Sequence, residues 1–242
     1  MSEWKQACWL AMFEVKSSLK GIITLAAMAL GLPLFFTELI SFSVLEDAPI
    51  VYDFFFVFIF WTVAASLRPK EIQLKKMSGD SWVSPYFIML NQLPIKKNVL
   101  VMSRFISYFS ISIPFHALFL TIYYALSPEL REVMPNASYI VFSIIWICFG
   151  IMSGSIFPAS DVGEKLSTWK IVVFNIFFFG AIIAIFLGFY FVYGQGIVAG
   201  TIHAANEWPL LSIAVSILIA VMGFLYSKGY IYKKIDKVDY LV

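Results

Sequence analysis

Six long apolar stretches, separated by short polar segments, constrain this chain more than any other feature of its sequence. They cover residues 21–45, 54–67, 99–126, 139–157, 171–192 and 209–227. A helix needs about 20 mostly apolar residues to cross a bilayer. The second stretch is short as delimited, so we extend it to begin near residue 50, which brings Asp53 to the outer interface. We therefore expect an all-α integral membrane protein with six transmembrane helices.

The composition agrees with lipid as the solvent for most of the chain. Hydrophobic residues make up 61% of its 242 residues and charged residues 13%, whereas a soluble domain has about 45–50% and about 25%. A globule of this length has too little interior for so much apolar surface. This excludes a soluble enzyme, a disulfide-stapled extracellular module and a disordered tail. Cys8 and Cys148 lie far apart, and we expect them to be buried or lipid-facing thiols.

The distribution of basic residues predicts one orientation. Of the 17 Lys and Arg residues, all but Arg131 fall in segments that six crossings place on the same side. Positively charged segments that flank membrane helices stay in the cytoplasm. We therefore expect both termini to be cytoplasmic in a single transmembrane domain over residues 1–242. Residues 1–20 form an interfacial helix, 21–227 the six spans and 228–242 a cytoplasmic tail.

The sequence offers no motif for catalysis in this chain. It has no Gly-x-x-x-x-Gly-Lys-Ser/Thr phosphate loop, and the longest inner connection, residues 68–98, is too short for a nucleotide-hydrolysing domain. Two isolated histidines cannot make an intramembrane metalloprotease. The run from Gly150 to Gly154 is one residue too long for the Gly-x-Ser-Gly of a rhomboid-type protease. We expect no catalytic residue, no metal or cofactor site and no nucleic-acid partner.

Three further residues within the spans have specific interpretations. His116 is the only titratable side chain expected deep in the membrane. It is either a neutral imidazole hydrogen-bonded to a neighbouring helix or part of a proton relay. Gly150 and Gly154 form a small-residue face on which another helix can pack closely.

The first 20 residues have the periodicity of an amphipathic helix. Polar residues such as Glu3 and Glu14 fall on one side, and we expect the apolar side to lie in the inner leaflet before the first span. The apolar residues recur at helical spacing: Trp4, Cys8, Ala11, Met12, Val15 and Leu19.

The connection between the second and third spans combines apolar and basic residues. An amphipathic stretch over residues 82–92 is followed by Leu93-Pro94-Ile95-Lys96-Lys97, and Arg104 lies just inside the third span. A proline ends one helix and favours the start of the next. We expect a short helix across the membrane surface, a proline turn and a basic cluster at the foot of the third span, with the Arg104 side chain reaching into the headgroups.

Leu93-Pro94-Ile95-Lys96-Lys97, with Val99 and Ser103-Arg104-Phe105 after it, resembles the signature of ABC-2 type permeases, the membrane subunits of bacterial ABC exporters. The chain carries Lys96-Lys97 where the family more often has Ser-Arg. The resemblance implies a bacterial cytoplasmic membrane protein that works with two ATP-binding subunits and a second permease subunit, identical or different. ATP and Mg²⁺ would bind to the partner subunits only.

The resemblance also implies a coupling element that docks into a groove on the ATP-binding subunit. Its residues here would be Trp82, Tyr86, Met89, Leu90, Leu93 and Pro94 as packing contacts, with Lys96 and Lys97 as electrostatic guides. By the same likeness, residues 194–208 either re-enter the outer leaflet or form a plain loop. We expect alternating-access export of an amphipathic cargo such as an antimicrobial peptide, a lipid or a hydrophobic drug. The alternative is a non-transporting scaffold or sensor that anchors a soluble ATPase or regulator.

Overall fold

The structure of the chain is a computed structural model that describes residues 2–45, 49–66, 68, 72–78, 81–165 and 167–237. Among these residues, five helices are long and apolar enough to cross a membrane, with spanning parts Leu19–Leu39, Lys97–Leu126, Asn136–Ser160, Thr168–Val192 and Pro209–Ile235. They correspond to α2 (Leu19–Leu45), α6 (Lys97–Leu126), α8 (Asn136–Gly154) with α9 (Ile156–Ser160), α10 (Thr168–Tyr193) and α12 (Pro209–Ile235). The long apolar helices are those of a membrane-embedded protein.

The predicted second span is a shorter apolar helix over Ile50–Ser66. It consists of α3 (Pro49–Phe58), a π-helical turn η1 (Ile59–Val63) and α4 (Ala64–Ser66). Seventeen residues at 1.5 Å each give about 26 Å, slightly less than the roughly 30 Å hydrocarbon core. The count of six transmembrane helices therefore stays a prediction.

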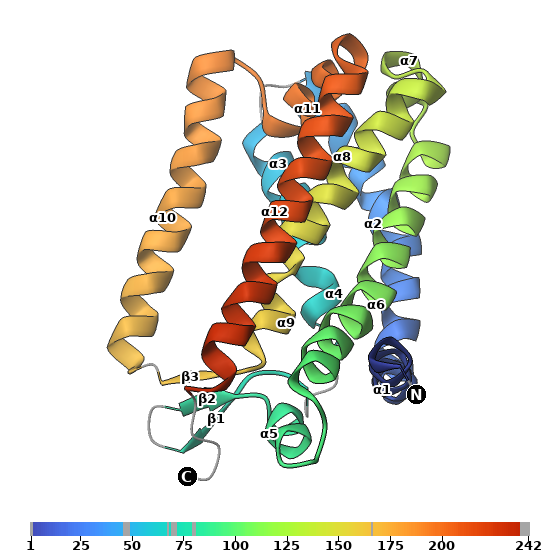
Figure 1. Cartoon of the computed structure of the whole chain (residues 1–242). Helices are drawn as coiled ribbons and strands as arrows, with labels where there is room; N and C mark the ends of the chain where they lie inside the picture. The colour runs from blue at the N-terminus through green and yellow to red at the C-terminus, as the bar shows by residue number, and fades with distance from the viewer. Residues whose placement is uncertain are drawn as a thin grey trace.

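Helix α8 lies at the centre of the bundle and packs against α6, α12, α11 (Ile197–Glu207) and η1 (Figure 1). Its glycines allow the close approach to α6. A Cβ atom on Gly150 would lie 2.7 Å from the His116 ring, and one on Gly154 would lie 2.6 Å from the Tyr108 hydroxyl. On α12, Gly223 receives the side chain of Met152 in the same way. Small residues thus set the spacing of these helices.

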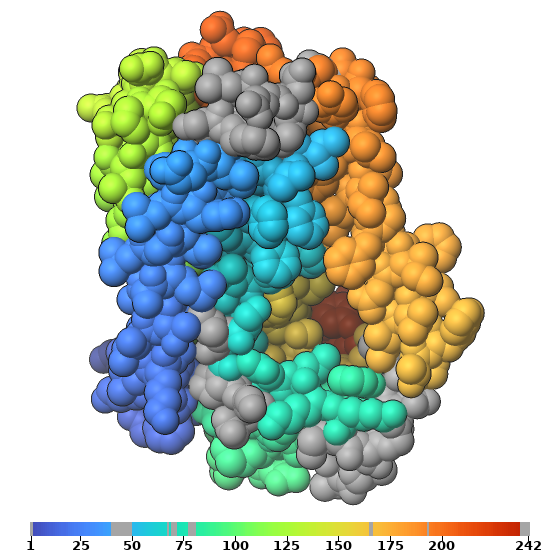
Figure 2. Space-filling model, turned by 180° about the vertical axis from the view of Figure 1, so that it is seen from behind, coloured from blue at the N-terminus to red at the C-terminus, as the bar shows by residue number. Residues whose placement is uncertain are grey.

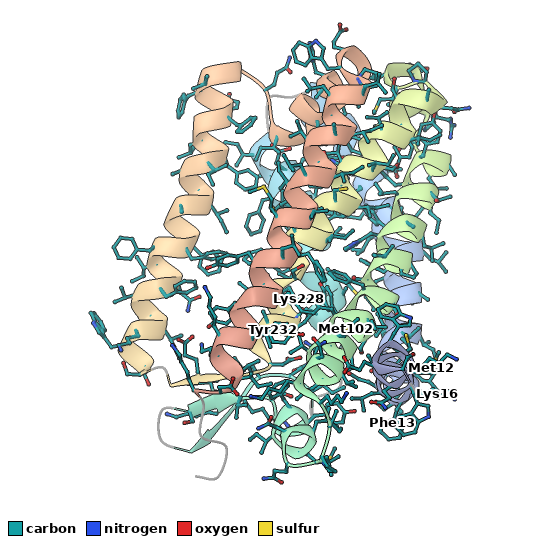
Figure 3. All side chains as sticks on the ribbon, viewed as in Figure 1. Met12, Phe13, Lys16, Met102, Lys228 and Tyr232 are labelled. Carbon is teal, nitrogen blue, oxygen red and sulfur yellow. The ribbon has the colours of Figure 1, made fainter. Side chains whose placement is uncertain are left out.

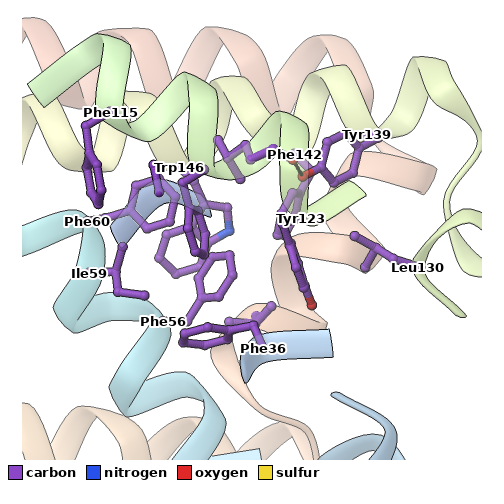
Figure 4. Packing of buried hydrophobic residues seen from close by; sticks show 14 of the residues in the cluster. Phe36, Phe56, Ile59, Phe60, Phe115, Tyr123, Leu130, Tyr139, Phe142 and Trp146 are labelled. Carbon is purple, nitrogen blue, oxygen red and sulfur yellow. Dashed lines mark hydrogen bonds between the residues drawn. The ribbon is translucent and has the colours of Figure 1, made fainter. Parts of the chain in front are cut away.

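An aromatic cluster packs in the interior of the bundle (Figure 4). Phe36 of α2, Phe56 of α3 and Tyr123 of α6 are fully buried there, and Trp146 of α8 stacks edge-on to Phe56 at 4.7 Å between ring centroids. The hydroxyls of Tyr52 and Tyr123 satisfy each other at 2.6 Å. Burying aromatic surface in this way ties α2, α3, α6 and α8 together.

Helix α10 stands apart from this cluster. It packs mainly against α3 and α11, and most of its phenylalanines are exposed, as in Phe174, Phe177 and Phe191. From behind, the space-filling view shows a hollow between α10 and α3–α4 through which α12 is visible (Figure 2). The exposed side chains of α10 have the apolar character of a lipid-facing surface.

The segment before α12, expected as a re-entrant element or a loop, contains helix α11. Asp53 is buried and accepts hydrogen bonds from the backbone amides of Ile197 and Val198, the latter at 3.0 Å. A carboxylate at a helix N-terminus satisfies unpaired amides and complements the helix dipole. Asp53 thus fixes α11 to α3.

We expect Asp53→Ala to destabilise the protein by about 1–2 kcal/mol, because the first amides of α11 lose their acceptor. Hydrogen exchange should show the loss mainly in α11, and thermal unfolding in detergent should report the total. Unchanged exchange in α11 would contradict the capping role.

The chain also contains a small sheet, which the expectation of helices alone did not include. Strands β1 (Lys75–Ser78), β2 (Ser81–Val83) and β3 (Glu164–Lys165) pair antiparallel in the order β1-β2-β3. The sheet joins the connection after α4 to the one after α9. Gly163 has φ +84°, and a Cβ there would lie 2.4 Å from the Trp82 carbonyl oxygen, so only glycine fits this join.

Helix α1 (Glu3–Ser17), the sheet, α5 (Pro85–Asn91) and the C-terminal end of α12 lie at one end of the bundle, and α7 (Pro128–Val133) lies at the other (Figure 1). In Figure 1, α1 is seen along its axis, whereas the long helices run from top to bottom of the view. Helix α1 therefore lies across the direction of the bundle. This is the direction expected of an interfacial helix. The end that holds α1 is called the basic end below.

Candidate functional site

Helix α5 and the turn after it form the element that the sequence singled out between the second and third spans. Ser84 caps the helix by accepting a hydrogen bond from the Phe87 amide at 3.4 Å, and Pro85 occupies its first position. The helix ends at Asn91, and the turn through Pro94 leads to α6 at Lys97. A short helix, a turn and a long helix therefore follow in the expected order.

The predicted contact residues lie on different sides of this element. Met89 and Leu93 are 49% and 47% exposed, and Pro94 is exposed beside them. Leu90, by contrast, is 3% exposed and packs with Phe87 into the apolar cluster of the basic end. Trp82, on β2, and Tyr86 are half-buried. Met89, Leu93 and Pro94 form the exposed apolar tip, whereas Leu90 anchors the helix from below.

The two lysines after the tip are paired within the chain. Lys96 lies 2.9 Å from Glu3 of α1, and Asn98 donates to the same carboxylate at 3.1 Å. Lys97 pairs with Asp236 after α12. The hydrogen bond from Lys96 lowers the pKa of Glu3. Both pairs are exposed to solvent and contribute little to stability, but they hold α1 and α12 beside the tip.

A buried cluster of four charges lies beneath α5. The guanidinium of Arg104 is 0% exposed and donates to Asp161 at 2.7 and 2.9 Å and to Glu14 at 2.6 Å. Arg68 donates to Asp161 at 2.8 and 3.3 Å and lies 3.8 Å from Glu14. Two guanidinium groups thus face two carboxylates. We refer to Glu14, Arg68, Arg104 and Asp161 as the buried charge cluster.

The cluster joins four separate parts of the chain. Glu14 comes from α1, Arg68 from the residues after α4, Arg104 from α6 and Asp161 from the end of α9. Burial raises the pKa of the Glu14 carboxyl, and the two guanidinium groups oppose that shift. Buried charges are retained only where they are paired and hydrogen-bonded, as these are.

Helix α5 contacts the cluster directly. The ring of Tyr86 lies 5.3 Å from the Arg104 guanidinium carbon, in the geometry of a cation–π contact. The backbone amide of Ser84 donates to the Asp161 carbonyl at 3.3 Å. The outer face of α5 therefore carries the exposed apolar tip, and its inner face contacts the buried charge cluster.

Two sequence-based placements are wrong here. Arg104 does not reach into the headgroups, and Glu14 does not lie on a polar side apart from the apolar residues, because each neutralises the other in the interior. Arg68 and Asp161 had not been singled out at all. One feature of the sequence could have indicated the cluster. Two arginines and two carboxylates lie near the ends of apolar stretches in a chain with only 13% charged residues.

Three of the six apolar residues predicted for the interfacial helix are mainly exposed, and one of them, Leu19, begins α2 instead of belonging to α1. Trp4, Met12 and Leu19 are more than half exposed, while Cys8 and Val15 are partly covered. The buried side of α1, which packs on α6, consists of Ala7, Leu10 and Glu14 together with Ala11, the one predicted apolar residue that is buried. Figure 3 shows Met12, Phe13 and Lys16 on the outer part of α1. An exposed apolar face on a helix that crosses the bundle end suits the membrane interface.

His116 lies in the interior of the bundle between α6, α8 and η1. Its ring is 4.8 Å from that of Phe60, is hydrogen-bonded to the backbone of Ile59 and covers Gly150. Its Nε2 has no hydrogen-bond partner among the described residues. These contacts fit the interpretation as an imidazole bonded to a neighbouring helix.

Among the described residues, no group of three or more His, Cys, Asp or Glu side chains is placed to hold a metal ion. No protein-family model, curated protein or solved structure matches this chain. The class of this protein therefore rests on its fold: it is an α-helical membrane protein. At its basic end, the connection that contains α5 packs on the buried charge cluster.

Proposed function

We propose that this chain is the permease subunit of an ATP-driven exporter, and that α5 with its turn is the surface that a separate ATP-binding subunit grips. The observation that carries the proposal is the two-sided construction of α5. Met89 and Leu93 are exposed on the outside, although apolar side chains of this size usually belong to a core or an interface. On the inside, Tyr86 and Ser84 contact the buried charge cluster.

This construction gives a route for mechanical coupling. A partner that moves α5 acts on Arg104 and Asp161, and through them on α1, α6 and α9, because charges that neutralise one another in the interior cannot separate cheaply. Helix α6 in turn packs against α8 in the bundle centre. In an assembly with a second permease subunit, such shifts would alternate access to a path across the membrane. ATP hydrolysis would occur on the partner subunits.

The proposed orientation in the membrane rests on the elements that lie at the basic end. Both α1 and the end of α12 lie there, and Arg131 lies in α7 at the opposite end (Figure 1). With the basic end in the cytoplasm of a bacterial cell, α5 is accessible to a soluble ATPase, as the positive-inside rule requires. The charge-free apolar stretches 139–157, 171–192 and 209–227 favour an amphipathic cargo. Stimulation of the complex's ATP turnover by amphipathic peptides or lipids, but not by sugars, would support that cargo class.

The test is a double substitution, Met89→Glu with Leu93→Glu, in the full-length chain expressed with the ATPase encoded beside it. Each substitution removes an apolar side chain whose burial in the interface would contribute about 1.5–3 kcal/mol. We therefore expect the amount of co-purified ATPase and the rate of ATP turnover to fall at least tenfold. Both positions are about half exposed, so the thermal unfolding of the permease should not change.

Gln92→Glu is the matched control, because it adds a negative charge on the same turn without removing apolar surface. It should retain the ATPase. Retention by the double variant would show that α5 is not the contact. If the ATPase co-purifies but no compound is moved by the wild-type complex, the scaffold alternative replaces the transport proposal.

A further inference from the structure

A cavity of about 510 Å³ lies between α6, α12 and the N-terminal end of α1. Its walls are almost entirely apolar and include Phe105, Ile106 and Phe109 of α6 and Phe224 of α12. Trp4 and Lys228 lie at the basic end of the cavity, and Pro114 lines it further along α6. Figure 3 labels Lys228 on α12 and Met102 on α6, which line this cavity together.

The cavity has the depth of one bilayer leaflet. Its lining runs from Met102 to Pro114 along α6, and twelve residues at 1.5 Å each span about 18 Å. Half of a hydrocarbon core of about 30 Å is about 15 Å. Both α6 and α12 are long enough to cross the membrane, so the cavity lies alongside lipid tails rather than water.

The proline of α6 leaves the Ser110 carbonyl without its helical hydrogen bond at the deep end of the cavity. Pro114 has no backbone N–H to donate, and both residues line the cavity. The same two residues line a smaller hollow on the side of α2. The deep end of the cavity therefore lies beside the proline of α6.

The charge of Lys228, at the basic end of the cavity, has no carboxylate partner among the described residues. Lys228 is also the only charged side chain among the described residues that line the cavity. A free cation at the mouth of a leaflet-deep apolar cavity complements an anionic head on an apolar tail.

We propose that this cavity binds one anionic phospholipid from the leaflet that borders the basic end. The phosphate contacts Lys228, one acyl chain lies along Ile106 and Phe109 toward Pro114, and Trp4 packs beside the headgroup. Tryptophan side chains prefer this level of the bilayer. The site does not depend on the transport proposal, since it uses neither α5 nor the buried charge cluster.

The experiment measures lipid binding to the purified full-length chain by native mass spectrometry. Phosphatidylglycerol and phosphatidylcholine with the same acyl chains are the probes. For one phosphate–lysine contact at the interface, we expect about fivefold tighter binding of phosphatidylglycerol. Lys228→Gln should remove this preference, and Ile106→Trp, which fills the cavity, should abolish retention of both lipids.

Two substitutions on α10 are the matched controls. Lys170→Gln removes a basic residue from the first turn of another long helix, and Val172→Trp adds the same bulk on an exposed face. Both should bind lipid as the wild type does. Equal binding of the two lipids by the wild type, or an unchanged preference in Lys228→Gln, would overturn the proposal. So would loss of a chain dimer, instead of a lipid, in Ile106→Trp, because the cavity would then be an interface between copies.

Discussion

Replacement of Arg104 by methionine is expected to destabilise the protein by about 3–5 kcal/mol, the range for removing one partner of a buried ion pair. The methionine fills most of the space, so the loss comes from the stranded charges. Asp161 would keep only Arg68, and Glu14 would lose its closest cation. Thermal unfolding in detergent, followed by size-exclusion chromatography, measures the effect.

Two variants separate charge from geometry in this experiment. Lys97→Met removes a cation from the start of the same helix, but its partner Asp236 is exposed, so the cost should be below about 1 kcal/mol. Arg104→Lys keeps the charge and loses the forked contact with both carboxylates, so it should fall between the two. An Arg104→Met variant as stable as Lys97→Met would show that the buried charge cluster does not hold the basic end together.

The second large effect is expected at Gly150. A leucine there would place its Cβ within 2.8 Å of the His116 ring, which Phe60 and Phe115 enclose. The His116 side chain is buried, so we expect α6 and α8 to move apart. Overpacking of this kind costs about 1–3 kcal/mol, occasionally more. Thermal unfolding of the full chain in detergent measures it.

Gly180→Leu on α10 is the control, because a Cβ atom there would meet nothing within 4 Å beyond the backbone of its own helix turns. It replaces glycine by a better helix former and should be neutral or slightly stabilising. Equal losses at the two glycines would show that the loss at Gly150 does not come from its close contact with His116. A loss at Gly150 alone would locate the close helix contact at α6.

The apolar stretches predicted the long helices well because lipid imposes a simple condition on sequence. Backbone polar groups in hydrocarbon must bond within the segment, so a long apolar run can only be a helix. This condition says least about the second stretch. Ile50–Ser66 lies at the lower limit of length for a membrane span and contains a π-helical turn. Sequence length alone does not decide whether such a helix spans.

The candidate site was predictable only in part. The break at Pro94 and the amphipathic residues around Met89 gave the short helix and the turn, because local propensity determines both. Which side of that helix is exposed depends on what it packs against, and this placed Leu90 in the interior. The sheet was missed for a similar reason: its strands are two to four residues long, and β3 pairs with β2 across a gap of about eighty residues.

The sequence by itself determined that this protein consists of apolar helices with its basic residues gathered in the segments on one side, because hydropathy and charge are properties of single segments. Only the tertiary structure decided that Glu14, Arg68, Arg104 and Asp161 meet in the interior. Taken singly, each reads as a surface charge near a helix end. Four chain segments must pack before these charges can neutralise one another, and that packing is what permits their burial.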